Sequence, residues 1–442
     1  MQKKSDTVQI IVLVVFGIGI ILGVLFFSGK ITLPWDKKAE TGLSGVVNVW
    51  GLIPYGNVKG LFDEIELKNK DLTLIYTEKK AETMQTELVN ALSSGKGPDV
   101  FMMAPGEVAQ NIDRLFIVPY SVYPEPTYRS TFVDAGNDFL TKQGILAFPM
   151  FINPMVMYYN FDMLNSAYIV NPPTTWNELA EMIPLLTIKD DAGKINQSAV
   201  SLGTASNMTY VKDLIILKTL QSGNPIIQAT DNSLWQAVLG EDSLGSSLDW
   251  FTSFSSSSSP NYTWNASLPK DRDFFNAGKL GIFFGYPEDY EVIREKNPNL
   301  NFRMTAIPQI SATSKKVNYG QLYSFGISKI TKNLAGSVGV INLLTSKENM
   351  TKLLTDLPYA PTRRDILADK PRDNSNKVLM YNSAIISKSF LDPDAKETNR
   401  LIINAVNQIN AGTKSAGSAF QSVASGFRDL ASKLVLPEIP LQ

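Results

Sequence analysis

The chain of 442 residues contains no histidine and no cysteine. Without these residues it cannot form Ser-His-Asp or Cys-His catalytic sites, disulfides, or zinc sites built on imidazole and thiolate ligands. A lipid anchor on a mature N-terminal cysteine is excluded for the same reason. Any enzyme built from this chain would depend on carboxylates, lysine, tyrosine or hydroxyl groups.

The sequence also lacks a strong excess of charge of either sign, since its formal net charge is −1. No basic stripe with interleaved aromatic residues is present, so we do not expect nucleic acid as a partner. Phosphate-binding loops of the Walker type, a G-x-G-x-x-G turn after a strand and a G-x-S-x-G elbow are absent as well. We therefore expect no cofactor, no metal site and no catalytic residues.

One long apolar run is present near the N-terminus, and it contains no charged residue from Val8 to Phe27. A helix of this length can cross the hydrocarbon layer of a membrane. The run is longer than the apolar region of most signal peptides, and no A-x-A cleavage pattern follows it, although a cleaved signal remains the alternative. We expect a single transmembrane anchor over residues 8–27.

Lysines flank both ends of this run, so the charge bias alone does not settle the orientation. The N-terminal tail, residues 1–7, is very short, and this favours a cytoplasmic tail with export of the large remainder. Residues 28–45 contain proline, glycine and charges, which is typical of a tether. The sequence thus predicts a single-pass protein of the cell membrane whose large domain lies on the extracytoplasmic side.

About 400 residues follow the tether, a length that suggests two domains or one two-lobed unit. Val46–Trp50, Leu72–Tyr76 and Asp99–Met103 are short runs typical of buried strands, and Ala81–Ser94 has the apolar spacing of a helix. Strands that alternate with helices indicate an α/β fold with a parallel sheet covered by helices.

Aromatic and polar residues stand at the carboxyl ends of predicted strands, where ligands bind in open α/β sheets. Aromatic faces and polar side chains are the usual equipment of a site for an amphipathic small molecule. Core packing of the aromatic residues and turn formation by the asparagines remain the alternatives. The candidate residues are Trp50, Asn153, Asn207, Tyr286 and Glu288.

Seven segments, in this order and spacing, resemble the extracellular solute-binding proteins of ABC importers, in the family that includes maltose-binding protein. They include a G-x-G-P-D-V piece, a Y-Y-N piece and a P-x-T-W-x-E-L piece. The segments are Val47–Trp50, Glu87–Val100, Phe148–Asn160, Pro172–Leu179, Phe275–Gly285, Tyr323–Asn333 and Leu357–Arg364.

The resemblance implies the two-lobed periplasmic-binding-protein fold of type II, an α/β fold with hinge crossovers, preceded here by one N-terminal transmembrane helix. It implies crossovers at Phe151–Met157, around Gln321–Phe325 and near Tyr359–Arg363. The expected lobes are residues 46–152 with 324–360, and residues 157–320 with 364–436.

By the same resemblance the protein binds a small solute, in particular a sugar, and hands it to a membrane permease. Asn153 falls where maltose-binding protein has an acidic ligand contact, Tyr286 lies near the family's stacking tryptophan, and Trp50 matches a frequent tryptophan. The crossovers add Tyr323 and Arg363 to the expected ligand-binding residues. We expect a monomeric binding protein and no enzyme activity.

Two other hypotheses stay open. An exported glycoside hydrolase would need two carboxylates facing each other across a cleft, about 5–9.5 Å apart. A tethered ligand sensor would share the fold but work without a permease.

Overall fold

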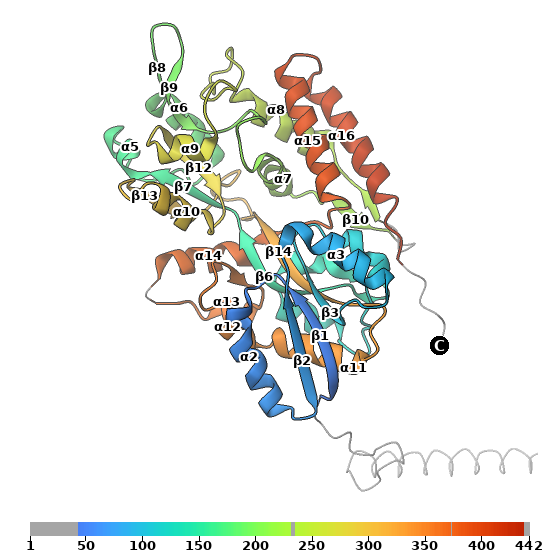
Figure 1. Ribbon diagram of the computed structural model, residues 1–442. Coiled ribbons are helices and arrows are strands. Elements are labelled where there is room, and N and C mark those ends of the chain that lie inside the picture. Colours follow the sequence, from blue (N-terminus) through green and yellow to red (C-terminus); the bar gives the residue numbers. More distant parts are fainter. Residues whose placement is uncertain (1–42, 231–234, 373, 437–442) are drawn as a thin grey trace, which may run out of the picture.

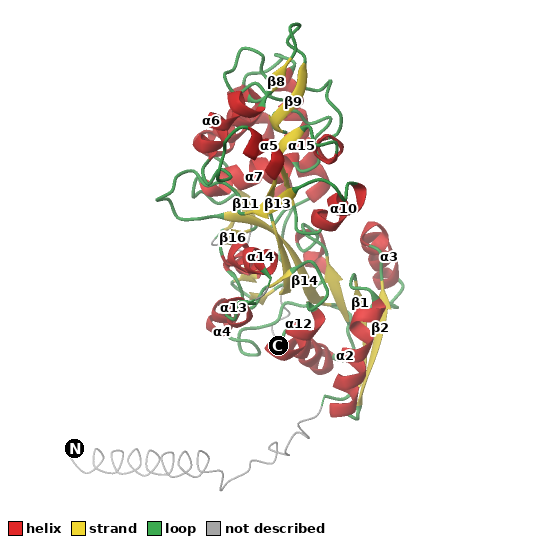
Figure 2. Cartoon of the chain, turned by 90° about the vertical axis from the view of Figure 1, so that its left-hand side faces the viewer, coloured by secondary structure: helices red, strands yellow, loops and turns green. Residues whose placement is uncertain are grey.

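The computed structural model of the chain describes residues 43–230, 235–372 and 374–436. Two lobes lie one above the other and are joined by strands that run through the waist between them (Figure 1). Each lobe has its own sheet, and helices flank the strands in both (Figure 2). The α/β class predicted from the strand–helix alternation is confirmed, but both sheets are mixed and not parallel throughout, because strands that enter from the other lobe pair antiparallel.

The first lobe is built on a seven-stranded sheet of order β15-β6-β14-β3-β1-β2, with β16 paired to β14. β1 pairs in parallel with β2 and β3, whereas β14 runs antiparallel to β3 and β6. The strands are β1 (Gly45–Gly51), β2 (Leu72–Glu78), β3 (Val100–Met103), β6 (Phe148–Pro154), β14 (Asn318–Ile327), β15 (Ala360–Pro361) and β16 (Ser387–Lys388).

The helices of the first lobe bury their apolar residues against this sheet and against one another. A small pair of strands, β4 (Leu140–Thr141) and β5 (Gly144–Ile145), accompanies them. The helices are α2 (Tyr55–Lys68), α3 (Ala81–Ser93), η1 (Ala109–Arg114), α4 (Glu125–Thr131), η2 (Asp134–Phe139), α11 (Leu334–Leu344), α12 (Lys347–Leu353), α13 (Arg364–Ala368) and α14 (Ser375–Ile385).

The second lobe is built on a five-stranded sheet of order β13-β7-β12-β9-β8, and β10 and β11 form a separate two-stranded sheet that contacts α16. The strands are β7 (Val156–Asn160), β8 (Ile188–Lys189), β9 (Ile195–Val200), β10 (Ile227–Ala229), β11 (Trp235–Ala237), β12 (Leu280–Gly285) and β13 (Phe302–Thr305). The helices are α5 (Phe161–Ser166), α6 (Trp176–Leu186), α7 (Val211–Gln221), η3 (Glu241–Gly245), α8 (Ser246–Ser253), α9 (Asp271–Asn276), α10 (Asp289–Lys296), α15 (Ala395–Asn410) and α16 (Ala416–Ala431).

Local sequence explains where α6 begins. The Thr175 hydroxyl accepts a hydrogen bond from the Glu178 backbone N–H at 3.2 Å, and the Glu178 carboxylate accepts one from the Thr175 N–H at 3.2 Å. This reciprocal pair satisfies two backbone donors that a helix start otherwise leaves free.

Three connections join the lobes. The first leads from β6 through Met155 into β7, within the range expected for it. The second, residues 306–317, precedes β14 and does not lie around Gln321–Phe325. The third, residues 389–394, follows β16 and does not lie near Tyr359–Arg363.

The assignment of residues 364–388 to the second lobe is therefore wrong. β15 pairs with β6, and α14 packs on β6, β14 and β15 of the first sheet. The buried side chains of α14, Met380, Tyr381 and Ala384, find their apolar surroundings there.

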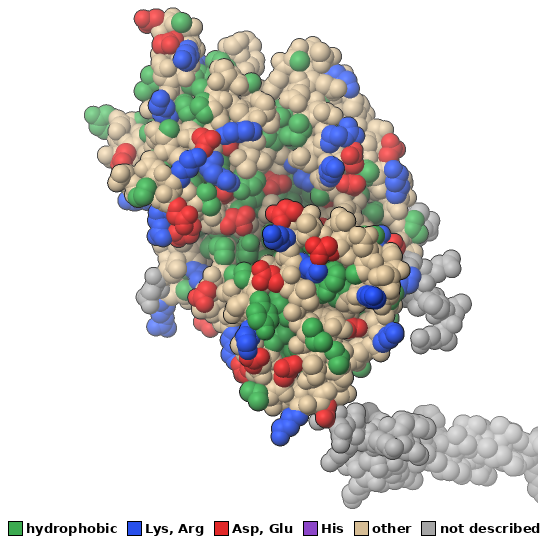
Figure 3. Space-filling view, viewed as in Figure 1, with side chains coloured by type: hydrophobic (Ala, Val, Ile, Leu, Met, Phe, Trp, Pro, Cys, Tyr) green, Lys and Arg blue, Asp and Glu red, His purple; other side chains and the backbone are tan. Residues whose placement is uncertain are grey.

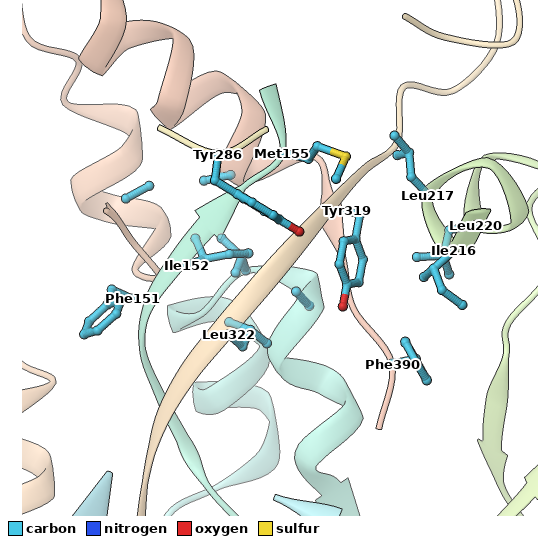
Figure 4. Close-up of a cluster of buried hydrophobic side chains, with 14 of the residues drawn as sticks. Phe151, Ile152, Met155, Ile216, Leu217, Leu220, Tyr286, Tyr319, Leu322 and Phe390 are labelled. Atoms are coloured by element: carbon cyan, nitrogen blue, oxygen red, sulfur yellow. The ribbon is translucent and has the colours of Figure 1, made fainter. Parts of the chain in front are cut away.

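A cluster of buried apolar side chains fills the waist (Figure 4). Ile152 of β6 and Met155 of the first connection lie there with Tyr286 and Tyr319, and each of these four is less than 9% exposed. The two lobes are thus joined by a continuous core as well as by three chain connections.

The predicted membrane anchor, Val8–Phe27, lies outside the described residues, as does most of the tether. Within the described ranges, no helix combines the length and the apolar character needed to cross a membrane.

Candidate functional site

Polar and aromatic side chains from both lobes meet between the lobes, beside the strands of the waist. On the face drawn in Figure 3, acidic and apolar side chains line the hollow between the two lobes. We call the following group the interlobe site: Phe151, Asn153, Asp213, Tyr286, Glu288, Gln321, Tyr323 and Tyr359.

The pairing of β6 with β14 supplies one side of the interlobe site. Asn153 lies opposite Gln321, and Phe151 lies opposite Tyr323. Side chains two residues apart on a strand share one face of the sheet. The amides and the aromatic rings therefore form two adjacent rows on the same face.

The aromatic row is a stacked group of three rings. The Phe151 ring lies 4.5 Å from the Tyr323 ring and 4.4 Å from the Tyr359 ring, measured between centroids, with interplanar angles of 29° and 14°. Tyr359 comes from the segment that precedes β15, so its place depends on the pairing of β15 with β6. Phe151 is buried, and the partly exposed rings of Tyr323 and Tyr359 offer an aromatic surface of the kind against which apolar faces of small molecules pack.

Asp213, near the start of α7 in the second lobe, links the lobes. Its Oδ2 accepts a hydrogen bond from the Tyr286 hydroxyl at 2.7 Å and one from Gln321 Nε2 at 3.1 Å. Burial raises the pKa of the Asp213 carboxyl, although the Lys212 charge and these two donors lower it. The bond to Gln321 ties the second lobe to a strand of the first.

Asn153 is the unpaired polar group of the interlobe site. It is 0% exposed, and within the described residues neither of its amide atoms has a partner at hydrogen-bond distance. Burial, followed by the charge of Asp289, raises the pKa of the Glu288 carboxyl, while Tyr359, the Arg272 charge and the Asn153 amide lower it; the amide lies near this carboxyl without the geometry of a hydrogen bond. A buried amide without a partner costs free energy, as polar groups at binding sites often do before a ligand satisfies them.

A buried ion pair fixes the loop that carries Tyr286 and Glu288. The Asp289 carboxylate accepts hydrogen bonds from the Tyr286 N–H at 2.9 Å and the Tyr210 hydroxyl at 3.0 Å, and it also pairs with Arg272. A side chain at Gly285 would clash with this carboxylate, which explains the glycine. The Asp289 contacts that fix the loop therefore all come from the second lobe.

The structure thus brings together four of the residues expected from the sequence: Asn153, Tyr286, Glu288 and Tyr323. It does not bring Trp50 to them. The Trp50 ring is half-buried beneath Lys79, whose Nζ lies 3.8 Å from the ring centroid. Trp50 lines a different surface cavity, beside residues 95–99.

Arg363 also lies apart from the interlobe site. Its guanidinium pairs with Asp365 at 2.8 Å and donates to the Thr345 carbonyl at 3.1 Å. These contacts hold it within the first lobe.

Asn207 has a structural role. Its Nδ2 donates to the carbonyls of Asn265 and Leu268 at 3.0 and 2.9 Å. Its Oδ1 accepts from Trp264 Nε1 at 3.1 Å and from the Thr204 hydroxyl. Because both amide atoms are occupied, we do not include Asn207 in the site.

Sequence reasoning missed Phe151, Asp213, Gln321 and Tyr359. A signal existed for two of them, because Asp213 and Gln321 are polar residues inside largely apolar segments, Val211–Leu220 and Tyr319–Ile327. Among the described residues, no group of three acidic side chains is arranged to hold a metal ion.

Two α/β lobes, three connections and a site between the lobes define a two-lobed binding-protein fold. A family model described as bacterial extracellular solute-binding protein matches residues 60–382. The chain therefore belongs to this family, and the resemblance inferred from the sequence is confirmed.

Known structures share the fold at low sequence identity. A cyclo/maltodextrin-binding protein complexed with maltotetraose is 14% identical, with a TM-score of 0.70, and the match covers 90% of this chain and 100% of that one. The extracellular solute-binding protein of Staphylococcus aureus in complex with maltose is 14% identical, with a TM-score of 0.69 and coverage of 87% and 97%. A protein of Brucella abortus (strain 2308) described as a binding protein is 21% identical over 375 residues, which cover 82% of this chain and 88% of that protein.

Proposed function

We propose that this protein captures a carbohydrate between its two lobes and delivers it to an ABC permease, while the apolar run Val8–Phe27 holds it at the membrane. The carbohydrate is inferred from the site, and two structural neighbours of the same fold are described in complex with maltose or maltotetraose. The permease and the tether follow from the family and from the sequence.

One observation supports the proposal above all: the buried Asn153 amide, which forms no hydrogen bond with any described residue, lies next to an aromatic surface. Asn153 offers both a donor and an acceptor, and the Glu288 carboxyl offers acceptors to hydroxyl groups. The partly exposed rings of Tyr323 and Tyr359, both stacked on the buried Phe151, supply the aromatic surface beside them. Sugars present hydroxyl edges and apolar ring faces, and this site matches both.

The proposed mechanism is a shift between open and closed arrangements of the lobes. Asn153 and Tyr359 belong to the first lobe, whereas Glu288 and Tyr286 belong to the second. A sugar that contacts all four does so only when the lobes are closed, so it stabilises the closed arrangement by its differential affinity.

The anchor accounts for retention at the membrane. A binding protein that serves a permease must stay close to it, and the chain has no cysteine to carry a lipid. The apolar run would replace that lipid, with the monomeric binding domain on the extracytoplasmic side. The protein would then act as a binding subunit and not as an enzyme.

Calorimetric titration of the full chain with maltose and maltotetraose tests the proposal. A polyoxyethylene detergent should be used, because a detergent with a sugar headgroup would compete. We expect saturable binding that is at least tenfold weaker in Asn153→Ala and Glu288→Gln. Trp50→Phe is the matched control and should bind as the native chain does.

Equal affinity in the native chain and both site variants would reject the site. Failure of every sugar in a broad screen to bind would reject carbohydrate as the ligand class. Release of shortened oligosaccharides during the titration would favour the hydrolase hypothesis.

A further inference from the structure

A second groove lies between the lobes, apart from the interlobe site. Its volume is about 380 Å³, and it is lined by η2 of the first lobe, residues 220–227 of the second lobe, and parts of the second and third connections. No residue of the interlobe site lines it. The groove is therefore a distinct feature of the place where the lobes meet.

Much of the groove wall is apolar. Its apolar lining residues are each 1–8% exposed, so only a small part of each side chain faces the groove: Ile226, Ile227, Val317 and Phe390. Such a wall favours an apolar body of modest size.

The polar end of the groove carries two acceptor groups, Asn137 and Asp138, to which no donor of the described residues is bonded. Asn137 Oδ1 is buried and has no hydrogen-bond partner within the described residues. Asp138 is partly exposed, and the two cations of this region, Lys388 and Arg364, pair with Asp134, so among the described residues the Asp138 carboxyl has no ion-pair partner. Burial raises the pKa of Asp138 to about 7, although the Lys388 charge lowers it.

The neighbouring cation does not satisfy these acceptors. Lys388 Nζ pairs with Asp134 at 2.8 Å, and Arg364 pairs with the other oxygen of Asp134 at 2.5 Å. Lys315 lines the groove at an exposed position. A ligand that brings its own positive charge and N–H donors would complete the polar end.

We propose that this groove binds an organic ammonium ion that carries an apolar body. The ammonium group would donate to Asn137 Oδ1 and the Asp138 carboxylate, and the body would pack on Ile226 and Phe390. Because both lobes line the groove, such a ligand favours the lobe arrangement described here. By linkage it also raises the affinity of any solute that binds the same arrangement.

Titration of the full chain with 2-phenylethylammonium at pH 8, in phosphate buffer and polyoxyethylene detergent, tests the inference. The phosphate buffer and this detergent contain no amine that would compete. Because no sugar is present, the result does not depend on the proposed function. We expect saturable binding, and at least tenfold weaker binding of the neutral analogue 2-phenylethanol. Equal affinities for the two compounds, or no saturable binding of the ammonium ion, would overturn the proposal.

Two variants locate the site. Asp138→Asn removes the charge with little change of shape and should weaken binding at least tenfold, while Asp356→Asn, an exposed acidic position in the same lobe, should leave it unchanged. Asn224→Trp, at the exposed rim, should block the groove without touching Asp138. If Asp138→Asn does not fold, the rim variant decides, and binding that survives it rejects the groove as the site.

Discussion

Replacement of Asn153 by leucine should stabilise the protein in the absence of ligand. The Asn153 side chain is 0% exposed and both of its amide atoms lack partners among the described residues. A buried polar group without a hydrogen bond costs about 1–3 kcal/mol, and leucine has a similar shape without polar atoms. We therefore expect Asn153→Leu to raise the free energy of unfolding by about 1–3 kcal/mol.

Asn207→Leu is the matched control, and the opposite sign is expected for it. Asn207 is also buried, at 5% exposure, but its amide accepts from the Trp264 indole and donates to two carbonyls. Trp264 is 0% exposed, so its N–H would be left buried without an acceptor. That loss alone should cost about 1–3 kcal/mol.

Urea unfolding of the full-length variants, followed by circular dichroism, measures both effects. The unfolding midpoint should rise for Asn153→Leu and fall for Asn207→Leu at unchanged slope. Maltose titration should show the reverse pattern, with affinity lost in the first variant and kept in the folded fraction of the second. A lower midpoint for Asn153→Leu, or shifts of the same sign in both variants, would refute the reasoning.

Three further outcomes are expected. The pKa of Asp138 is raised to about 7 in the folded chain. Between pH 4 and 7 this carboxyl therefore binds more protons in the folded chain than in the unfolded chain. The free energy of unfolding should fall as pH rises through this window. Asp138→Asn should flatten that slope in urea midpoints taken at pH 5 and 7.5, and an unchanged slope would contradict this. Arg272→Leu should lower the free energy of unfolding by up to about 3 kcal/mol because it leaves the buried Asp289 carboxylate without its cation. The double variant with Asp289→Asn should recover part of this loss in the same assay. Tyr359→Ala should weaken maltose binding about tenfold because it removes one ring of the stack. Tyr359→Phe keeps the ring and should lose less affinity. An equal loss of affinity in the two variants would contradict a role of the ring in stacking.

The sequence predicted those parts of the site that depend on position along a strand or on local motifs. The polar residue at the end of β6, Asn153, and the aromatic and acidic residues after β12, Tyr286 and Glu288, do meet at the interlobe site. The capping pair of Thr175 and Glu178 starts α6 from residues three positions apart. These features depend on a few neighbouring residues, so a linear sequence contains them.

Trp50 shows where such reasoning ends. Its place at the end of β1 is as predicted, but the alternation of the strand puts Val47 and Val49 in the core and turns Trp50 to the other face, under Lys79. Whether a strand-end residue faces a site depends on that register and on what covers each face. Neither is set by the residue itself.

The sequence by itself determined the fold class, the long apolar run and the absence of histidine and cysteine chemistry, because composition and periodicity carry this information. Only the tertiary structure decided that Asp213 meets Tyr286 and Gln321, that Asn207 is occupied, and that Asn153 is left without a partner. These outcomes depend on contacts between residues that are far apart in the chain. Burial and hydrogen-bond satisfaction are set when those segments pack together.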